Sequence, residues 1–156
     1  MAEHNIFTFA IAAAVAATGF SILFNIPKKL FPTIGILGAA AVCTKFFFIL
    51  ELEFSAAFAT LAGSTFAGIL AIKARQITNT PMQVLIIPAM IPLVPGVLIY
   101  QFLYCCIAID YLSAEEFFQA VKLGFDATQI LFAIAIGAVL PILIGTKIFD
   151  KKEQLQ

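Results

Sequence analysis

A cluster of prolines in the middle of a long apolar stretch is the feature of this sequence that most directly suggests a function. Pro88, Pro92 and Pro95 have no backbone N–H, so a helix that passes through them leaves the carbonyl groups four residues earlier without their usual partners. Gly96 follows and lets the backbone turn freely. Inside a bilayer, irregular backbone persists only against protein or beside a water-filled cavity. Because transporters bind substrates at such broken helices near the membrane midplane, we expect a substrate to pass close to residues 88–96.

Polar side chains around this segment extend the set of candidates, and each has an alternative explanation. Gln83 before the break and Tyr100 after it can hydrogen-bond a substrate, or can lie at the two membrane interfaces. Lys45 lies inside an apolar run, where it either attracts an anionic carboxylate or extends its amine to the interface. Asp126 either belongs to a polar outer mouth or caps a helix. The candidate substrate-binding residues are therefore Gln83, Pro88, Pro92, Leu93, Val94, Pro95, Gly96, Tyr100, Lys45 and Asp126.

The remaining reactive side chains do not form a recognisable catalytic or metal-binding set. His4 is the single histidine, and Cys43, Cys105 and Cys106 lie in apolar runs that are typical of buried thiols rather than of a disulfide framework. The sequence contains no Walker A pattern for binding nucleotide phosphates. We therefore predict that the protein is not an enzyme and that it uses neither a metal nor another cofactor.

The composition predicts an integral membrane protein. Hydrophobic residues make up 62% of the 156-residue chain and charged residues 12%, against about 45–50% and about 25% in a typical soluble domain. The formal net charge is zero, and no basic patch is present, so nucleic acid is not an expected partner. The tail before the first apolar run has no Lys or Arg, so we expect that run to be a retained transmembrane helix and not a signal peptide.

Five apolar segments predict an all-α membrane protein with five transmembrane helices, the fourth of them broken. Each segment is close to the ~20 residues that cross a hydrocarbon core of about 30 Å. The expected spans are residues 5–26, 32–50, 54–74, 81–109 and 126–148, within a single membrane domain, residues 1–156. Small residues recur every four positions in the first and third spans, which is typical of helices that pack inside a bundle.

A short additional helix is expected between the fourth and fifth spans, over residues 113–124. Ser113 and Glu116 match the capping-box pattern that begins a helix, and Gly124 is a suitable helix stop. The apolar side chains of this segment share one face, which suits an interfacial helix lying on the outer membrane surface. A solvated loop helix packed against the spans is the alternative, and the sequence does not distinguish the two.

The charged residues predict how these spans are oriented in the membrane. With five spans, seven of the nine basic residues fall on one side, namely Lys28, Lys29, Lys73, Arg75, Lys147, Lys151 and Lys152. Most acidic residues gather on the other side, namely Glu3, Glu51, Glu53, Asp110, Glu115 and Glu116. The positive-inside rule then predicts an N-terminus outside the cell and a C-terminus in the cytoplasm.

Two segments resemble the signature motifs of a known family, the threonine/serine exporters (ThrE). Residues 19–29, with the sequence GFSILFNIPKK, are similar to one family motif. Residues 81–96, which begin with PMQV and end with PAMIPLVPG, are similar to the other, and Tyr100 follows as in the family. Over nearly its whole length the chain resembles the small, YjjB-like subunit of exporters that are split into two chains.

The resemblance implies a multi-pass subunit that exports small polar metabolites across the bacterial inner membrane. Threonine and serine are the substrates it implies first, and dicarboxylates such as succinate come second. It also implies a partner, the larger, YjjP-like membrane subunit of the same exporter, and it leaves a homo-oligomer open. Two alternative functions remain on the sequence alone: a channel-like oligomer, and a non-transporting assembly subunit that stabilises a partner membrane protein.

Overall fold

The computed structural model describes the backbone of residues 6–109 and 112–153, and the side chains of residues 6–109 and 112–143. Every regular element in these ranges is helical, which confirms the all-α prediction. The elements are α1 (Ile6–Leu23), the 3₁₀ helix η1 (Lys28–Leu30), α2 (Phe31–Leu50), α3 (Ala56–Thr78), α4 (Met82–Met90), the 3₁₀ helix η2 (Ile91–Leu93), α5 (Gly96–Ile107) and α6 (Ala114–Glu153). Outside the described part lie Glu3, His4 and Asp110, together with the side chains of Lys147, Lys151 and Lys152.

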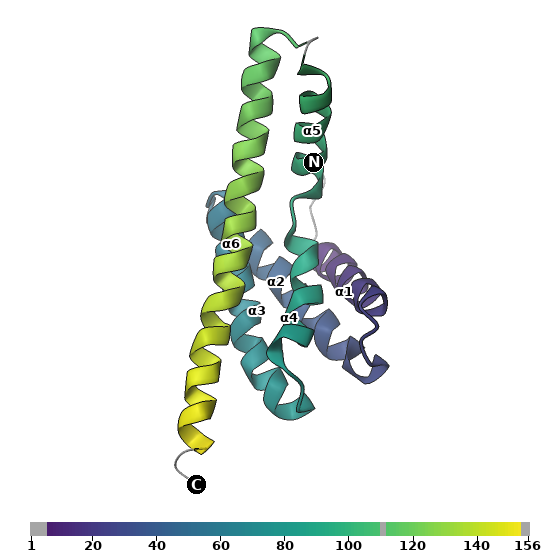
Figure 1. Ribbon diagram of the computed structural model, residues 1–156, viewed down its shortest axis with the longest axis vertical. Helices are drawn as coiled ribbons and strands as arrows, with labels where there is room; N and C mark the ends of the chain where they lie inside the picture. The colour runs from purple at the N-terminus through teal and green to yellow at the C-terminus, as the bar shows by residue number, and fades with distance from the viewer. Residues whose placement is uncertain (1–5, 110–111, 154–156) are drawn as a thin grey trace.

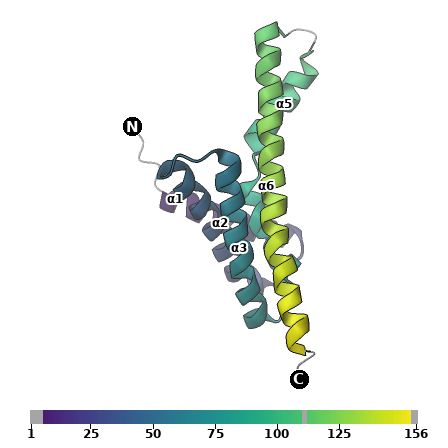
Figure 2. The same cartoon turned by 90° about the vertical axis from the view of Figure 1, so that its left-hand side faces the viewer.

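Helix α6 runs along the whole length of the molecule, and the other helices are arranged beside it (Figure 1). Helices α1 to α4 gather along its C-terminal half, and α5 lies along its N-terminal half. Seen from the side, α2 and α3 stand between α1 and α6 (Figure 2), and α3 packs directly on α6. By length and composition, four described helices can cross a membrane, or five spans exist if the bent pair α4–α5 counts as one.

Small residues let α1, α2 and α3 approach closely, as the sequence predicts for the third span. The buried residues of α3 are Ala59, Thr60, Gly63, Ser64, Ala67, Gly68, Ala71 and Ala74. A Cβ atom at Gly38 of α2 would lie 2.8 Å from the Cβ of Ala17 in α1, closer than real side chains approach. Helix α1 is less enclosed than the sequence predicts, because α2 covers one of its faces while Phe7 on another is 70% exposed.

The interruption that the sequence predicts within residues 81–109 is present. Helix α4 begins after Pro81 and contains Pro88, continues for one 3₁₀ turn as η2, and is followed by α5 after a bend of 63°. The backbone leaves helical geometry at Val94 (φ −62°, ψ 131°) and Pro95 (φ −81°, ψ 64°). Gly96 then begins α5. Pro92 and Pro95 therefore coincide with the interruption that their missing N–H groups predict, whereas Pro88 is accommodated inside α4.

Helix α6 corrects the prediction of a separate interfacial helix over residues 113–124 and a fifth span over 126–148. Both segments belong to one continuous helix, Ala114–Glu153, which passes through Gly124 without a break. A Cβ atom at Gly124 would lie 2.7 Å from the ring of Phe102 in α5. This glycine therefore allows two helices to approach and does not end one, because packing against α5 favours helical continuation.

The start of α6 is formed as the sequence predicts. The Ser113 backbone N–H and hydroxyl both donate to Oε2 of Glu116, with distances of 2.8 and 2.7 Å. In return, the Glu116 backbone N–H donates to the Ser113 hydroxyl oxygen at 3.4 Å. This reciprocal arrangement satisfies donors that a helix N-terminus otherwise leaves without partners, and it fixes where α6 begins.

Candidate functional site

The backbone at the break satisfies more of its hydrogen bonds than the sequence predicts. Because Pro95 has no N–H, the Ile91 carbonyl was expected to lack a partner. Instead it accepts a hydrogen bond from the Val94 N–H at 3.0 Å, through the tighter 3₁₀ turn. The Val94 carbonyl in turn accepts from the Gly96 N–H at 2.9 Å. The Ile91 carbonyl therefore has a backbone partner in place of the one that Pro95 cannot supply.

One side of the break is sealed by protein. Pro88, Ala89 and Leu93 are fully buried, and η2 packs on α1 and α2. The approach is close, since a Cβ atom at Gly38 of α2 would lie 3.5 Å from the Ala89 carbonyl oxygen. Val94 and Gly96 on the other side of the break are exposed. The segment thus has the protein-lined environment that irregular backbone needs in a membrane, and it opens away from α1 and α2.

Measured along α6, the break lies nearer Asp126 than the far end of the charge-free stretch that follows it. Residues 127–146 of α6 carry no Asp, Glu, Lys or Arg, and at ~1.5 Å per residue they are about 30 Å long, which matches the hydrocarbon core. Helix α4 starts beside Ile142 of α6. From there α4 and η2 rise roughly 19 Å, or about 13 residues of α6, so the break falls near Ile130. Of the two charged residues that border this charge-free stretch of α6, Asp126 is the one closer to the break.

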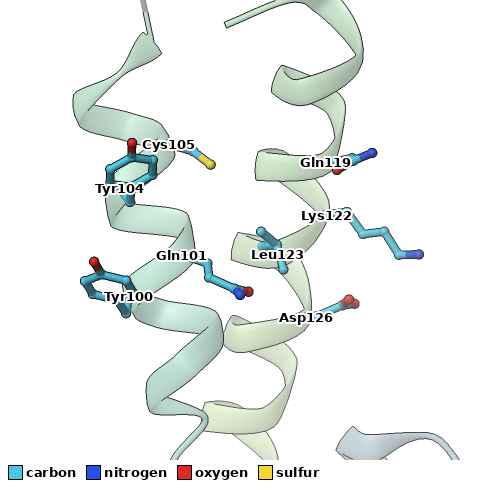
Figure 3. A pocket seen from close by; sticks show the side chains of 8 residues that line it. All are labelled: Tyr100, Gln101, Tyr104, Cys105, Gln119, Lys122, Leu123 and Asp126. Atoms are coloured by element: carbon cyan, nitrogen blue, oxygen red, sulfur yellow. The ribbon is translucent and has the colours of Figure 1, made fainter.

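A polar pocket lies beyond the break, between α5 and α6, and we call it the outer pocket. Its volume is about 690 Å³, and it is lined by Tyr100, Gln101, Tyr104, Cys105, Gln119, Lys122, Leu123 and Asp126. In Figure 3, Gln101 and Cys105 of α5 point toward α6, and Gln119, Lys122 and Asp126 lie along one side of α6. Two of the predicted site residues, Tyr100 and Asp126, therefore line the same pocket from different helices, although their side chains point away from each other (Figure 3).

A second polar pocket lies at the opposite end of α4, and we call it the inner pocket. Its volume is about 540 Å³, and it is lined by Arg75, Gln76, Asn79, Thr80, Pro81, Met82, Gln83 and Ile142. Asn79 ends α3 in the left-handed conformation, with φ 48°, which is a common way for an asparagine to stop a helix. Gln83 also lines a neighbouring groove of about 410 Å³, which extends to Pro88. Of the predicted residues, Gln83 thus lies at this end, whereas Pro88 lies near the other end of α4, beside the break.

The other predicted residues do not converge on either pocket. Pro92, Leu93, Val94, Pro95 and Gly96 form the break itself and line neither the outer nor the inner pocket. Lys45 is half-buried on α2. Its backbone lies beside α3, since a Cβ atom at Gly63 would collide with the Ala41 carbonyl oxygen and lie 3.3 Å from the Lys45 backbone nitrogen. Lys45 therefore belongs to the α2–α3 contact and not to the surface between α5 and α6.

Sequence reasoning missed Lys122 and Gln119 as site residues. The signal was present, because Gln119, Lys122 and Asp126 follow helical spacing and so share one face of a helix. The expected helix stop at Gly124 separated Lys122 from Asp126 and concealed this relationship. At the inner pocket, sequence reasoning considered Arg75 only for its charge and did not consider Asn79. Neither residue belongs to a recognisable motif in the turn between α3 and α4.

The arrangement defines a class of protein before any comparison is made: a multi-pass helical membrane protein whose broken span runs between two polar pockets. A family model, "Threonine/Serine exporter, ThrE", matches residues 9–144. The chain belongs to this family, as its two sequence motifs indicate.

The relatives add little about activity. An uncharacterized protein of Haemophilus influenzae is 28% identical over 134 residues, which cover 85% of this chain and 45% of that protein. The chain therefore spans about half the length of this curated relative. No solved structure matches the chain. Family membership thus comes from sequence, and the geometry of the pockets comes from this structure alone.

Proposed function

We propose that this chain is a subunit of a bacterial inner-membrane exporter of small polar metabolites, with threonine and serine as its substrates. The observation that carries the proposal is the course of the broken α4–α5 span, which starts at the inner pocket, bends, and continues along the outer pocket. Substrate enters at the inner pocket, passes the break and leaves through the outer pocket. Dicarboxylates such as succinate are the second substrate class to test.

The route follows α6, which lines both pockets. Ile142 belongs to the inner pocket and Asp126 to the outer one, and the helix between them rises about 24 Å. This intervening part of α6 is free of charged residues. A small zwitterion therefore meets polar groups at both ends and an apolar barrier between them, which must open during transport. The bend at Val94–Pro95 is a suitable hinge for that opening, because Pro95 cannot restore the helix.

The orientation follows from the charged residues around the inner pocket. Arg75 lines this pocket, and Lys28, Lys29 and Lys73 belong to helix ends that lie toward the same end of the molecule as the C-terminus of α6 (Figure 1). Under the positive-inside rule this end faces the cytoplasm. The inner pocket is then the entrance for cytoplasmic substrate, and the N-terminus lies outside.

A larger membrane subunit of the same exporter is the partner that we propose. Helix α5 has no buried residue, and Ile107 at its end is 85% exposed. The break is likewise covered by α1 and α2 on one side only. A second membrane subunit, or another copy of this chain, would close the open side of the route between the two pockets.

The decisive experiment compares cells that lack this chain with cells that regain it, each with and without the larger subunit. Cells loaded with threonine, serine and succinate are followed for the intracellular pool and for appearance of each compound outside. The proposal predicts that threonine and serine accumulate inside in the absence of the chain and that restoring it lowers both pools. Unchanged pools of all three compounds would refute the exporter.

A second measurement separates an exporter from the two alternatives. Reconstituted vesicles are given an ion gradient, and threonine movement is measured against its own concentration gradient. Uphill movement supports coupled export, whereas movement that only dissipates the gradient indicates a channel-like oligomer. Efflux that depends on the larger subunit and is insensitive to changes at the break or at either pocket would instead indicate an assembly subunit.

A further inference from the structure

The wall of the outer pocket carries two oppositely charged residues, Lys122 and Asp126, that make no stabilising polar contact within the described part of the chain. Lys122 and Asp126 lie four residues apart on α6, so they fall on one face of the helix. Both line the pocket. Within residues 6–109 and 112–143, neither side chain takes part in an ion pair or a hydrogen bond. A cation and an anion therefore lie about one helical turn apart beside a cavity, and we take them to be available to a ligand.

The rest of the pocket supplies neutral polar groups and no further charge. Gln119 precedes Lys122 by about one turn of α6, and Gln101 reaches toward α6 from α5 (Figure 3). Each amide side chain offers two N–H donors and one carbonyl acceptor. The Tyr100 phenol adds a hydroxyl group. A ligand that satisfies this pocket carries one negative group, one positive group and a small polar part.

Close helix packing fixes the backbone of α6 at the level of the two charged residues. Gly124 stands between them in sequence, and a Cβ atom there would lie 2.7 Å from the Phe102 ring of α5. The two helices are therefore in direct contact at the level of the pair. This contact sets the separation of α5 and α6 at this level, and the Lys122 and Asp126 side chains extend from the side of α6 turned away from α5 (Figure 3).

The spacing of the pair suits an α-amino acid. Residues four apart on an α-helix are separated by about 6 Å along the axis. The ammonium and carboxylate of an α-amino acid are attached to one carbon atom, and the long, flexible Lys122 side chain adjusts its reach to the carboxylate while Asp126 accepts from the ammonium. A dicarboxylate instead brings a second negative charge toward Asp126, where like charges repel.

We propose that Lys122 and Asp126 are the specificity-determining pair of the exporter. Lys122 binds the α-carboxylate and Asp126 binds the α-ammonium of a zwitterionic amino acid in the outer pocket, and Gln101 and Gln119 hydrogen-bond its polar side chain. This inference rests on the proposed function. It adds the site and the pair of residues that select a zwitterion over a dicarboxylate.

The test measures equilibrium binding to the purified protein in lipid nanodiscs, together with the larger subunit if the two copurify. Four probes separate the charges: L-threonine has both, N-acetyl-L-threonine only the carboxylate, L-threoninol only the ammonium, and succinate two carboxylates. Asp126→Asn is expected to weaken threonine and threoninol binding about tenfold or more, and to leave N-acetylthreonine and succinate unchanged or stronger. Lys122→Gln is expected to weaken threonine and N-acetylthreonine similarly, and to spare threoninol.

Glu115→Gln is the matched control, since it removes a charge from the same helix outside the pocket. It should bind all four probes as the wild type does, and thermal unfolding of each variant shows that the fold is retained. Threonine binding within about twofold of wild type in both pocket variants overturns the proposal, as does equal weakening of all four probes. Wild-type protein that binds none of the probes also overturns it. Failure of the exporter is recognised separately, by unchanged metabolite pools in cells that lack the chain.

Discussion

The hydroxyl of Ser64 in α3 donates a hydrogen bond to the backbone carbonyl of Ala133 in α6, across a distance of 3.2 Å. The two residues are 69 positions apart in the sequence, and the bond is buried. The same hydroxyl also contacts the Leu61 carbonyl of its own helix at 3.1 Å. Because α6 carries residues of both pockets, this contact fixes the helix along which they are arranged relative to the rest of the bundle.

Replacing Ser64 by Ala is expected to destabilise the contact between α3 and α6 by about 0.6 kcal/mol, and by no more than about 1.7 kcal/mol, the range for interhelical hydrogen bonds in membranes. The change is measured as the free energy of unfolding in detergent or bicelles. Ser21→Ala is the matched control, because Ser21 is equally buried but donates only to Ala17 of its own helix. Equal effects of the two substitutions would contradict a stabilising role for the interhelical bond.

Gly137→Ala is expected to cost more than the loss of that hydrogen bond, about 1–3 kcal/mol, which is typical of overpacking. A Cβ atom at Gly137 would collide with the Ser64 hydroxyl and would lie 2.9 Å from the Leu61 carbonyl oxygen. Gly19→Ala on α1 is the control, since no atom lies within 4 Å of its added Cβ, and better helix propensity should make it neutral or slightly stabilising. A Gly137 variant as stable as the Gly19 variant would show that α3 and α6 do not pack in this register.

Pro95→Ala restores an N–H at the break and is expected to reduce threonine efflux while leaving assembly of the exporter intact. The physical reason is that α4 and α5 can then join with less bend, which moves the outer pocket relative to the inner one. Pro32→Ala is the matched control, because Pro32 lies in the first turn of α2, where its missing N–H costs no helical bond. Efflux is followed from loaded cells, and assembly by copurification. Unchanged efflux in the Pro95 variant would remove the bend from the mechanism.

Cysteine labelling tests the orientation. In a chain whose Cys43 and Cys105 are replaced by Ala, Cys106 on the exposed surface of α5 is expected to react with a membrane-impermeant maleimide added outside the cell. A chain without native cysteines that carries Gln76→Cys, at the inner pocket, should react only in inside-out vesicles. The opposite pattern would place the inner pocket outside and would reverse the proposed direction of entry. Mass spectrometry of the labelled peptides identifies the modified residue.

Much of the fold follows from the chemistry of residues that are close together in the sequence. Pro92 and Pro95 remove two backbone donors within four residues, and the apolar segment breaks there, between Ile91 and Gly96, while α4 continues through Pro88. Ser113 and Glu116 form a capping box through side chains three residues apart, and they begin α6 as expected. Small residues in the third span mark the face that packs, since only small side chains let helix backbones approach. Each of these properties depends on residues that are close in the chain.

The candidate site depended on contacts between distant residues, and these only the tertiary structure decided. Gly124 is a residue type that commonly ends helices, yet the Phe102 ring packs against it and the helix continues. That single outcome puts Lys122 and Asp126 on one helix face beside α5, whereas an end at Gly124 would have separated them. A glycine lowers the cost of leaving a helix and equally lowers the cost of a close approach by a neighbour. Which of the two occurs is determined by the packing energy of the neighbouring helix, and the local sequence does not contain that energy.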